Sequence, residues 1–193
     1  MHEIHVSEGV VLNKRAVGEA NTLVFVLTKQ LGLIRAQARS SRVEESKLRY
    51  GLEPLTSGRY SFVRGKREWR LTGVEQVSHE AMGKSVTRRQ AAGRISKLLL
   101  RLVQGEEPLP ALYDAVASGL VHMATAQSDT DAQAIETVLV LRVLAQLGYL
   151  PRTPELLPFI SDHLFTIELA AAAAERRNLL IRAINESLQH TGL

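Results

Sequence analysis

The sequence contains no cysteine. Disulfide bonds, thiolate nucleophiles and cysteine-ligated zinc are therefore excluded, and we expect no metal site. The chain must fold through its own core. With 193 residues and 45% hydrophobic content, it is long enough to bury one. A chain without cysteine also fits a reducing compartment such as the cytoplasm.

Long apolar runs and catalytic motifs are missing as well. No apolar stretch reaches the roughly 18 residues that suggest a membrane span, and the start, at residues 1–5, lacks the order of a signal peptide. There is no glycine-rich phosphate loop, no Gly-x-Ser-x-Gly elbow and no spaced carboxylate pair in an apolar setting. The sequence predicts a cytoplasmic protein that is not an enzyme and binds no cofactor.

Aromatic residues are scarce, at 5% of the chain, which limits base stacking as a binding mechanism. Tyr60 and Phe62 fall on the same face of a predicted strand, a pattern typical of core. Tyr50 and Trp69 lie among basic residues and fit either core or stacking. We therefore expect phosphate contacts to dominate any nucleic-acid binding.

Charge is distributed unevenly. Residues 1–101 hold 19 of the 24 Lys and Arg residues but only 9 of the 20 Asp and Glu residues, and residues 102–193 hold 5 basic and 11 acidic residues. A basic half joined to an acidic half suggests that the first half faces a polyanion. Chance clustering on a solvated surface is the alternative.

The basic half begins with strand-like alternation between residues 9 and 77. Segments 9–17, 22–28, 33–39, 52–63 and 69–77 alternate in polarity and are separated by turn signals. Five short strands in about 70 residues favour a closed barrel, because closure removes exposed strand edges. The OB-fold is the candidate architecture.

Basic residues cluster where such a barrel usually meets nucleic acid, which is the first strand connection and the last hairpin. A lone arginine is more often a solubility residue than a contact, so the prediction depends on their joint placement. The predicted DNA-binding residues are Lys14, Arg15, Arg35, Arg39, Arg42, Lys47, Arg49, Arg64, Lys66, Arg67, Arg88 and Arg89.

From about residue 80 the apolar period changes to that of helices. We expect helices at 83–104, 110–126, 132–147 and 163–189, with a capping sequence at Ser128–Asp131. The helix at 132–147 is apolar nearly all round and predicted to be central. The first helix is basic on one side. This side either adds further phosphate contacts to those of the barrel or is simply a solvated surface. The predicted fold is α+β with two domains: an OB-fold barrel over 1–79 and an all-helical domain over 80–193.

Several ordered fragments resemble the RecO family of bacterial recombination mediators. They are Gly9-Val10-Val11-Leu12, Gly18-Glu19-Ala20-Asn21, Leu27-Thr28-Lys29-Gln30-Leu31-Gly32-Leu33-Ile34, Ala36-Gln37-Ala38-Arg39, Ser46-Lys47-Leu48, Leu52-Glu53-Pro54-Leu55 and residues 144–151, Leu-Ala-Gln-Leu-Gly-Tyr-Leu-Pro. The resemblance covers roughly residues 5–151. It implies an OB-fold and a helical domain, binding of single- and double-stranded DNA, strand annealing, nucleoid association when bound to DNA, and partnership with RecR, single-strand-binding protein and the RecA recombinase.

The sequence departs from that family in two ways. Many members carry a cysteine zinc site after the Gly-Tyr-x-Pro stretch, and this chain has no cysteine. The chain is also shorter than is usual for the family, which puts the partner-binding surface of the helical domain in more doubt than DNA binding. A DNA repair and recombination mediator is the leading hypothesis, and an RNA-binding OB-fold protein or a protein-interaction adaptor are the alternatives.

Overall fold

The computed structural model describes residues 3–66, 68–82, 85–161 and 164–190. The chain forms two compact units. The first comprises Met1–Met82 with Val103–Tyr113, and the second comprises Gly83–Leu102 with Asp114–Leu193. The segment after the first helix thus belongs with the barrel, where the Leu33 amide donates a hydrogen bond to the Gly105 carbonyl (3.2 Å).

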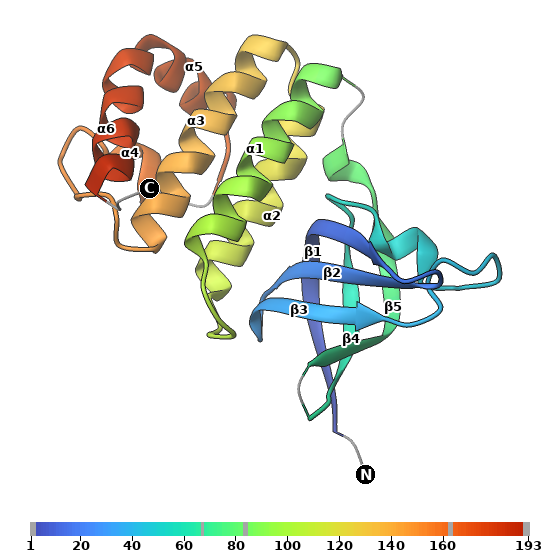
Figure 1. The fold of residues 1–193 in the computed structure, drawn as a ribbon. Coiled ribbons are helices and arrows are strands. Elements are labelled where there is room, and N and C mark those ends of the chain that lie inside the picture. Colours follow the sequence, from blue (N-terminus) through green and yellow to red (C-terminus); the bar gives the residue numbers. More distant parts are fainter. Residues whose placement is uncertain (1–2, 67, 83–84, 162–163, 191–193) are drawn as a thin grey trace. The chain divides into compact units, whose positions relative to one another are not determined.

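Five strands form a closed barrel in the order β1-β2-β3-β5-β4 (Figure 1). All neighbouring strands are antiparallel except β3 and β5, which pair in parallel. The predicted five-stranded OB-type barrel is confirmed. Its strands are β1 (Ile4–Val17), β2 (Asn21–Thr28), β3 (Gly32–Ala38), β4 (Ser57–Arg64) and β5 (Trp69–Ser78).

Alternating residues of the strands fill the barrel. Val24 and Val26 of β2 and Ile34 of β3 are fully buried, together with Tyr60 and Phe62 of β4. The two rings were predicted to be core, and they stack at 6.3 Å between centroids. The Tyr60 hydroxyl donates to the Gly51 carbonyl at 2.9 Å. Burial raises the pKa of Tyr60, so the phenol remains a donor at neutral pH.

Two strand boundaries differ by more than one residue from those expected. Strand β1 begins at Ile4 rather than at residue 9, because residues 4–10 pair with β4. Residues 52–56 do not belong to a strand. Leu52 ends the 3-10 helix η1 (Arg49–Leu52), and residues 53–56 follow it with Leu55 at φ +70°, a backbone conformation incompatible with an extended strand.

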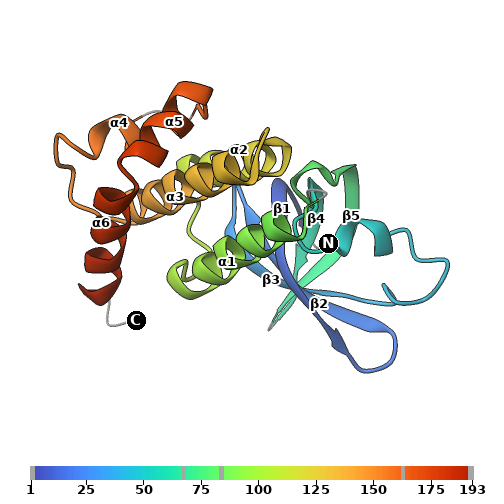
Figure 2. The ribbon, with the colours of Figure 1, turned by 90° about the horizontal axis from the view of Figure 1, so that it is seen from above.

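The helical unit is organised around α3 (Asp129–Gln146), which contacts α1 (Val86–Leu102), α4 (Leu157–Ile160), α5 (Ile167–Glu175) and α6 (Arg177–His190). Figures 1 and 2 show α3 running between α1 and the C-terminal helices. Helix α2 (Pro110–Thr125) precedes α3, and the short 3-10 helix η2 (Glu80–Met82) precedes α1. The predicted cap at the start of α3 is confirmed, as a capping box between Ser128 and Asp131.

The predicted helix at 163–189 is divided. Helix α5 follows the Thr166 cap and ends at Glu175, and α6 starts at Arg177 after the C-cap residue Arg176. Two short-side-chain residues of α5, Ala170 and Ala173, are buried. The buried Arg142 of α3 donates to the carbonyls of Phe159 and Leu164, both at 2.9 Å, and so fixes the segment before α5.

Among the described residues, no helix combines the length and apolarity required to cross a membrane.

Candidate nucleic-acid interface

A row of residues on the side of the sheet opposite the barrel core crosses four strands; it is exposed at Arg15, partly exposed at Gln37 and Arg70, and buried at Leu23 (5% exposed). Arg15 of β1 is opposite Leu23 of β2, Leu23 is opposite Gln37 of β3, and Gln37 is opposite Arg70 of β5. Their neighbours Val24 and Ala36 point into the core, so the alternation of the strands directs this row outward. The row brings together basic residues from distant parts of the sequence.

Exposed arginines extend this row along β3. Arg35 and Arg39 are exposed on the same face as Gln37, and the Arg39 Nε donates to Gln37 Oε1 at 3.4 Å. Residues 20–43 contain four basic and no acidic residues, so no carboxylate of this stretch neutralises the arginines. We call Arg15, Arg35, Arg39 and Arg70 the strand face.

Arg70 was not among the predicted residues. Its guanidinium lies beside Gly65, about 3.7 Å from where a Cβ of that residue would be. Gly65 belongs to the β4–β5 hairpin, which carries Arg64 and Lys66. The hairpin turn is closed by a hydrogen bond from the Gly65 amide to the Glu68 carbonyl (2.9 Å). Lys66 is exposed, and Arg67 lies outside the described residues.

Arg64 is committed to contacts within the barrel unit. It forms an ion pair with Glu106, and its guanidinium lies 4.9 Å from the centre of the Trp69 ring. The indole Nε1 of Trp69 donates to the same Glu106 carboxylate at 2.9 Å. The His5 ring packs against the indole as well, in a T-shaped arrangement with 5.2 Å between centroids. Trp69 is only 6% exposed, so it is not a free stacking surface.

Other aromatic rings are accessible. Tyr50, on η1, is 74% exposed. Phe25 of β2 is partly buried, on the same side of the sheet as Leu23, and lies between Asn13 of β1 and Arg35 of β3. Sequence reasoning did not single out Phe25. Its signal was the strand alternation, which places Phe25 on the face opposite Val24 and Val26.

The remaining predicted barrel cations surround one end of the barrel. A polar cavity of about 330 Å³ is lined by Lys14, Thr22, Ser41, Arg42, Arg49, Leu52 and Glu53. We call it the mouth pocket. The loop that forms its wall is fixed to the β1–β2 turn, since the Arg42 amide donates to the Ala20 carbonyl and its guanidinium to the Gly18 carbonyl, both at 3.0 Å. Lys47 is exposed on the same loop and does not line the cavity.

The predicted cations of α1 are tied to their own unit. The Arg88 guanidinium donates to Asp129 Oδ1 and to the Ala124 carbonyl, both at 3.1 Å. Its side chain is only 17% exposed. Arg89 is exposed but also interacts within the chain. Arg94 forms a bidentate pair with Glu136 (2.7 and 2.8 Å), and this bond raises the pKa of the guanidinium.

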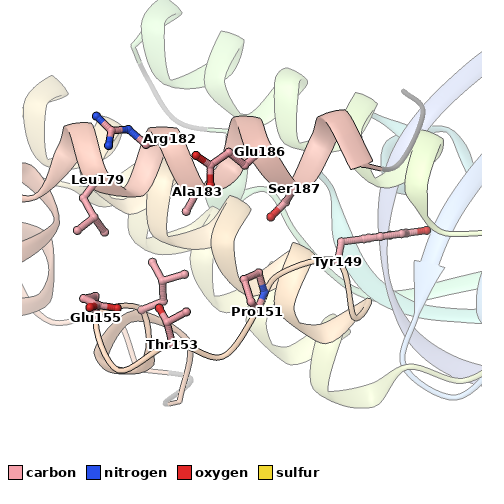
Figure 3. A pocket seen from close by; sticks show the side chains of 10 residues that line it. Tyr149, Pro151, Thr153, Glu155, Leu179, Arg182, Ala183, Glu186 and Ser187 are labelled. Carbon is pink, nitrogen blue, oxygen red and sulfur yellow. The ribbon is translucent and has the colours of Figure 1, made fainter.

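The helical unit has cavities of its own. One, of about 280 Å³, lies between α6 and the loop at 149–156 (Figure 3). Ala183 and Ser187 of α6 point toward the loop residues Pro151 and Thr153. A second, of about 220 Å³, is lined by residues of α2, α3 and α5. Among the described residues, no three His, Asp or Glu side chains are arranged to hold a metal ion.

Known sequences place this chain in a family. Residues 1–79 match the family described as "Recombination protein O N terminal", and residues 85–155 match "Recombination protein O C terminal". The DNA repair protein RecO of Heliobacterium modesticaldum is 30% identical over 146 residues, which cover 75% of this chain and 52% of that protein. The RecO proteins of Exiguobacterium sibiricum and Bifidobacterium longum are 25% and 29% identical, over 57% and 61% of their lengths.

The chain therefore spans little more than half the length of these relatives. Both family matches occur in the expected order, the first on the barrel and the second mainly on the helical unit. The resemblance seen in the barrel fragments thus holds across both parts of the chain. The chain belongs to the RecO family of DNA repair proteins.

Proposed function

We propose that this chain binds single- and double-stranded DNA through the strand face of its barrel and acts as a recombination mediator. The observation that supports this is the outward row that joins Arg15, Gln37 and Arg70 across the sheet, with Arg35 and Arg39 beside it. These four arginines are exposed or partly exposed and lie on one curved sheet, which is the kind of basic surface along which OB-folds bind a nucleic-acid backbone.

Strand annealing follows from the same electrostatics. Each cation that neutralises a phosphate releases a condensed counterion and lowers the repulsion between two complementary strands. The partly buried Phe25 adds a ring beside Arg35, on which one base can stack without sequence preference. The mechanism requires no catalytic group, which agrees with a mediator rather than an enzyme.

The helical unit is proposed to contact proteins. By membership of the RecO family, its partners would be RecR, single-strand-binding protein and the RecA recombinase, which it would help to load onto DNA. The cavities beside α3 and α6 offer partly apolar recesses for such contacts. Residues 114–193 of this unit hold nine acidic and five basic residues, so this stretch is a poorer surface for nucleic acid than the strand face.

Binding to a fluorescent single-stranded oligonucleotide, measured by anisotropy over a salt series, tests the proposal. About six phosphate contacts predict a slope of log affinity against log salt of about −4. Changing Arg35, Arg39 and Arg70 together to Gln should make that slope shallower, from about −4 to about −2, since each lost contact removes about 0.7 from its magnitude. Annealing of complementary strands, followed by energy transfer, should slow in parallel.

A matched triple variant provides the control. Arg59, Arg152 and Arg182 are exposed arginines outside the strand face, and changing them to Gln removes the same total charge. Equal losses in both triple variants would show that binding follows net charge, and would reject the strand face. Failure of the wild type to bind at low salt would favour the adaptor hypothesis. Equal or better competition by RNA of the same sequence would favour the RNA-binding hypothesis.

A further inference from the structure

The mouth pocket differs from the strand face in shape and in its polar groups. Its floor contains two buried hydroxyls, those of Thr22 (6% exposed) and Ser41 (2% exposed). The two oxygens are 2.9 Å apart, and Ser41 Oγ also lies 3.0 Å from the Ala38 carbonyl. Ser41 has one proton for these two acceptors. The paired hydroxyls make the floor of the cavity polar.

The walls of the pocket supply net positive charge. Lys14, Arg42 and Arg49 line it, with Glu53 as the one acidic residue. Lys14 Nζ donates to Glu53 at 2.6 Å, which leaves two ammonium donors for another partner. The Arg42 guanidinium uses one of its five N–H groups on Gly18. The Arg49 side chain is exposed and has no hydrogen bond or ion pair within the described residues.

Three cations and one carboxylate give the pocket a balance of two positive charges. An internal phosphodiester carries one negative charge, whereas a terminal phosphomonoester carries about 1.5 to 2 at neutral pH. A recess with a closed floor also suits an end group, because an internal phosphate has chain leaving on both sides. Both charge and shape thus favour a strand end over the middle of a strand.

We propose that the mouth pocket binds a phosphomonoester at the end of a nucleic-acid strand. This inference rests on the proposed DNA-binding function and deepens it. The strand face and the pocket are joined by the chain itself, since Arg39 is followed after one residue by Ser41. The exposed ring of Tyr50, next to Arg49 on η1, is available to stack on the terminal base. One protein could then hold both the body of a strand and its phosphorylated end.

The test compares oligonucleotides of one sequence, labelled internally, that carry a 5′-phosphate, a 3′-phosphate or hydroxyls at both ends. The wild type should bind one of the phosphorylated forms about tenfold more tightly than the hydroxyl form. This difference corresponds to about one additional charge-assisted hydrogen bond. Arg49→Gln should bring this ratio close to one. Because Arg49 is exposed, the variant should fold, which its circular dichroism and thermal unfolding would check.

Arg15→Gln is the matched control. Arg15 follows Lys14 on β1 but belongs to the strand face, so this variant should weaken binding of all three oligonucleotides and keep the ratio. Equal wild-type affinities for the three forms would overturn the pocket proposal and leave the proposed function intact. A ratio that persists in Arg49→Gln would also overturn it. If the wild type binds none of the forms, the proposed function itself fails.

Free phosphate is the other source of the same chemistry. At constant ionic strength, inorganic phosphate should displace the phosphorylated oligonucleotide only at concentrations at least a hundredfold above the dissociation constant of that oligonucleotide. Displacement at concentrations close to that dissociation constant, if Arg49→Gln abolishes it, would assign the pocket to small phosphates. That result would reject a strand end as the ligand.

Discussion

At the scale of single residues, Trp69 shows how a neighbour distant in sequence decides a side chain's role. Sequence pattern left the ring equally suited to core or to base stacking. Glu106, 37 residues later, accepts the indole N–H and pairs with Arg64, which covers the ring. No local pattern contains this contact, because it depends on the segment after α1 packing against β5. Tyr60 and Phe62 could be predicted as core, since strand alternation alone determines their direction.

Replacing Glu106 tests this arrangement. Glu106→Gln keeps an acceptor for the indole but removes the charge that strengthens both bonds. The carboxylate is 43% exposed, so solvent screening limits the expected loss of unfolding free energy to about 1 kcal/mol. Urea unfolding followed by emission of Trp69, the single tryptophan, measures it. Glu107→Gln, at the neighbouring exposed acid, is the control; a similar loss there would mean that the effect is not specific to Glu106.

At the scale of elements, the barrel strands could be predicted because period-two alternation is a local property. Which strands become neighbours is not local. The parallel pairing of β3 with β5, which places Arg70 beside Gln37, joins segments more than thirty residues apart. The break between α5 and α6 could not be predicted from the sequence either, because the residues around Arg176 include neither proline nor glycine. Three of the four arginines of the strand face could thus be named from the sequence, but neither Arg70 nor the pairing of the strands could.

Two glycines with positive φ test how tightly the segment after α1 is held against the barrel. At Gly32 (φ +73°) a Cβ would lie 2.4 Å from the Glu107 carbonyl oxygen, whereas at Gly18 (φ +60°) it would meet nothing within 4 Å. Gly18→Ala should therefore cost only the backbone strain, about 1 kcal/mol. Gly32→Ala should cost about 2 kcal/mol or more, because the segment must also shift. Denaturant unfolding of both variants measures the difference; equal costs would contradict tight packing at Gly32.

At the scale of the whole molecule, charge separates the two halves of the chain, and this could be read from the sequence. The two compact units do not follow this division: the helical unit, with 11 basic and 9 acidic residues, includes the basic helix α1, and the barrel unit, with 13 basic and 11 acidic residues, includes the acidic segment 103–113. Its Glu106 engages Arg64, so one predicted DNA contact is used for internal structure. Arg88 is used in the same way within the helical unit. Counting charges located the basic half but did not distinguish free cations from paired ones.

The cations of α1 provide the last prediction. Lys97 and Arg101 are exposed on α1, and α1 has no acidic residue of its own to neutralise them. If they engage the same strand as the barrel, affinity should keep rising with oligonucleotide length beyond the 4 to 16 or so nucleotides that one OB-fold occupies. We expect this rise in the wild type and its loss in a Lys97→Gln, Arg101→Gln double variant, with unchanged binding of the shortest oligonucleotides. Anisotropy over a length series at fixed salt measures both. An identical length dependence in the two proteins would show that DNA binding is confined to the barrel. In that case the additional phosphates of a longer strand meet no further cations, and no further counterions are released.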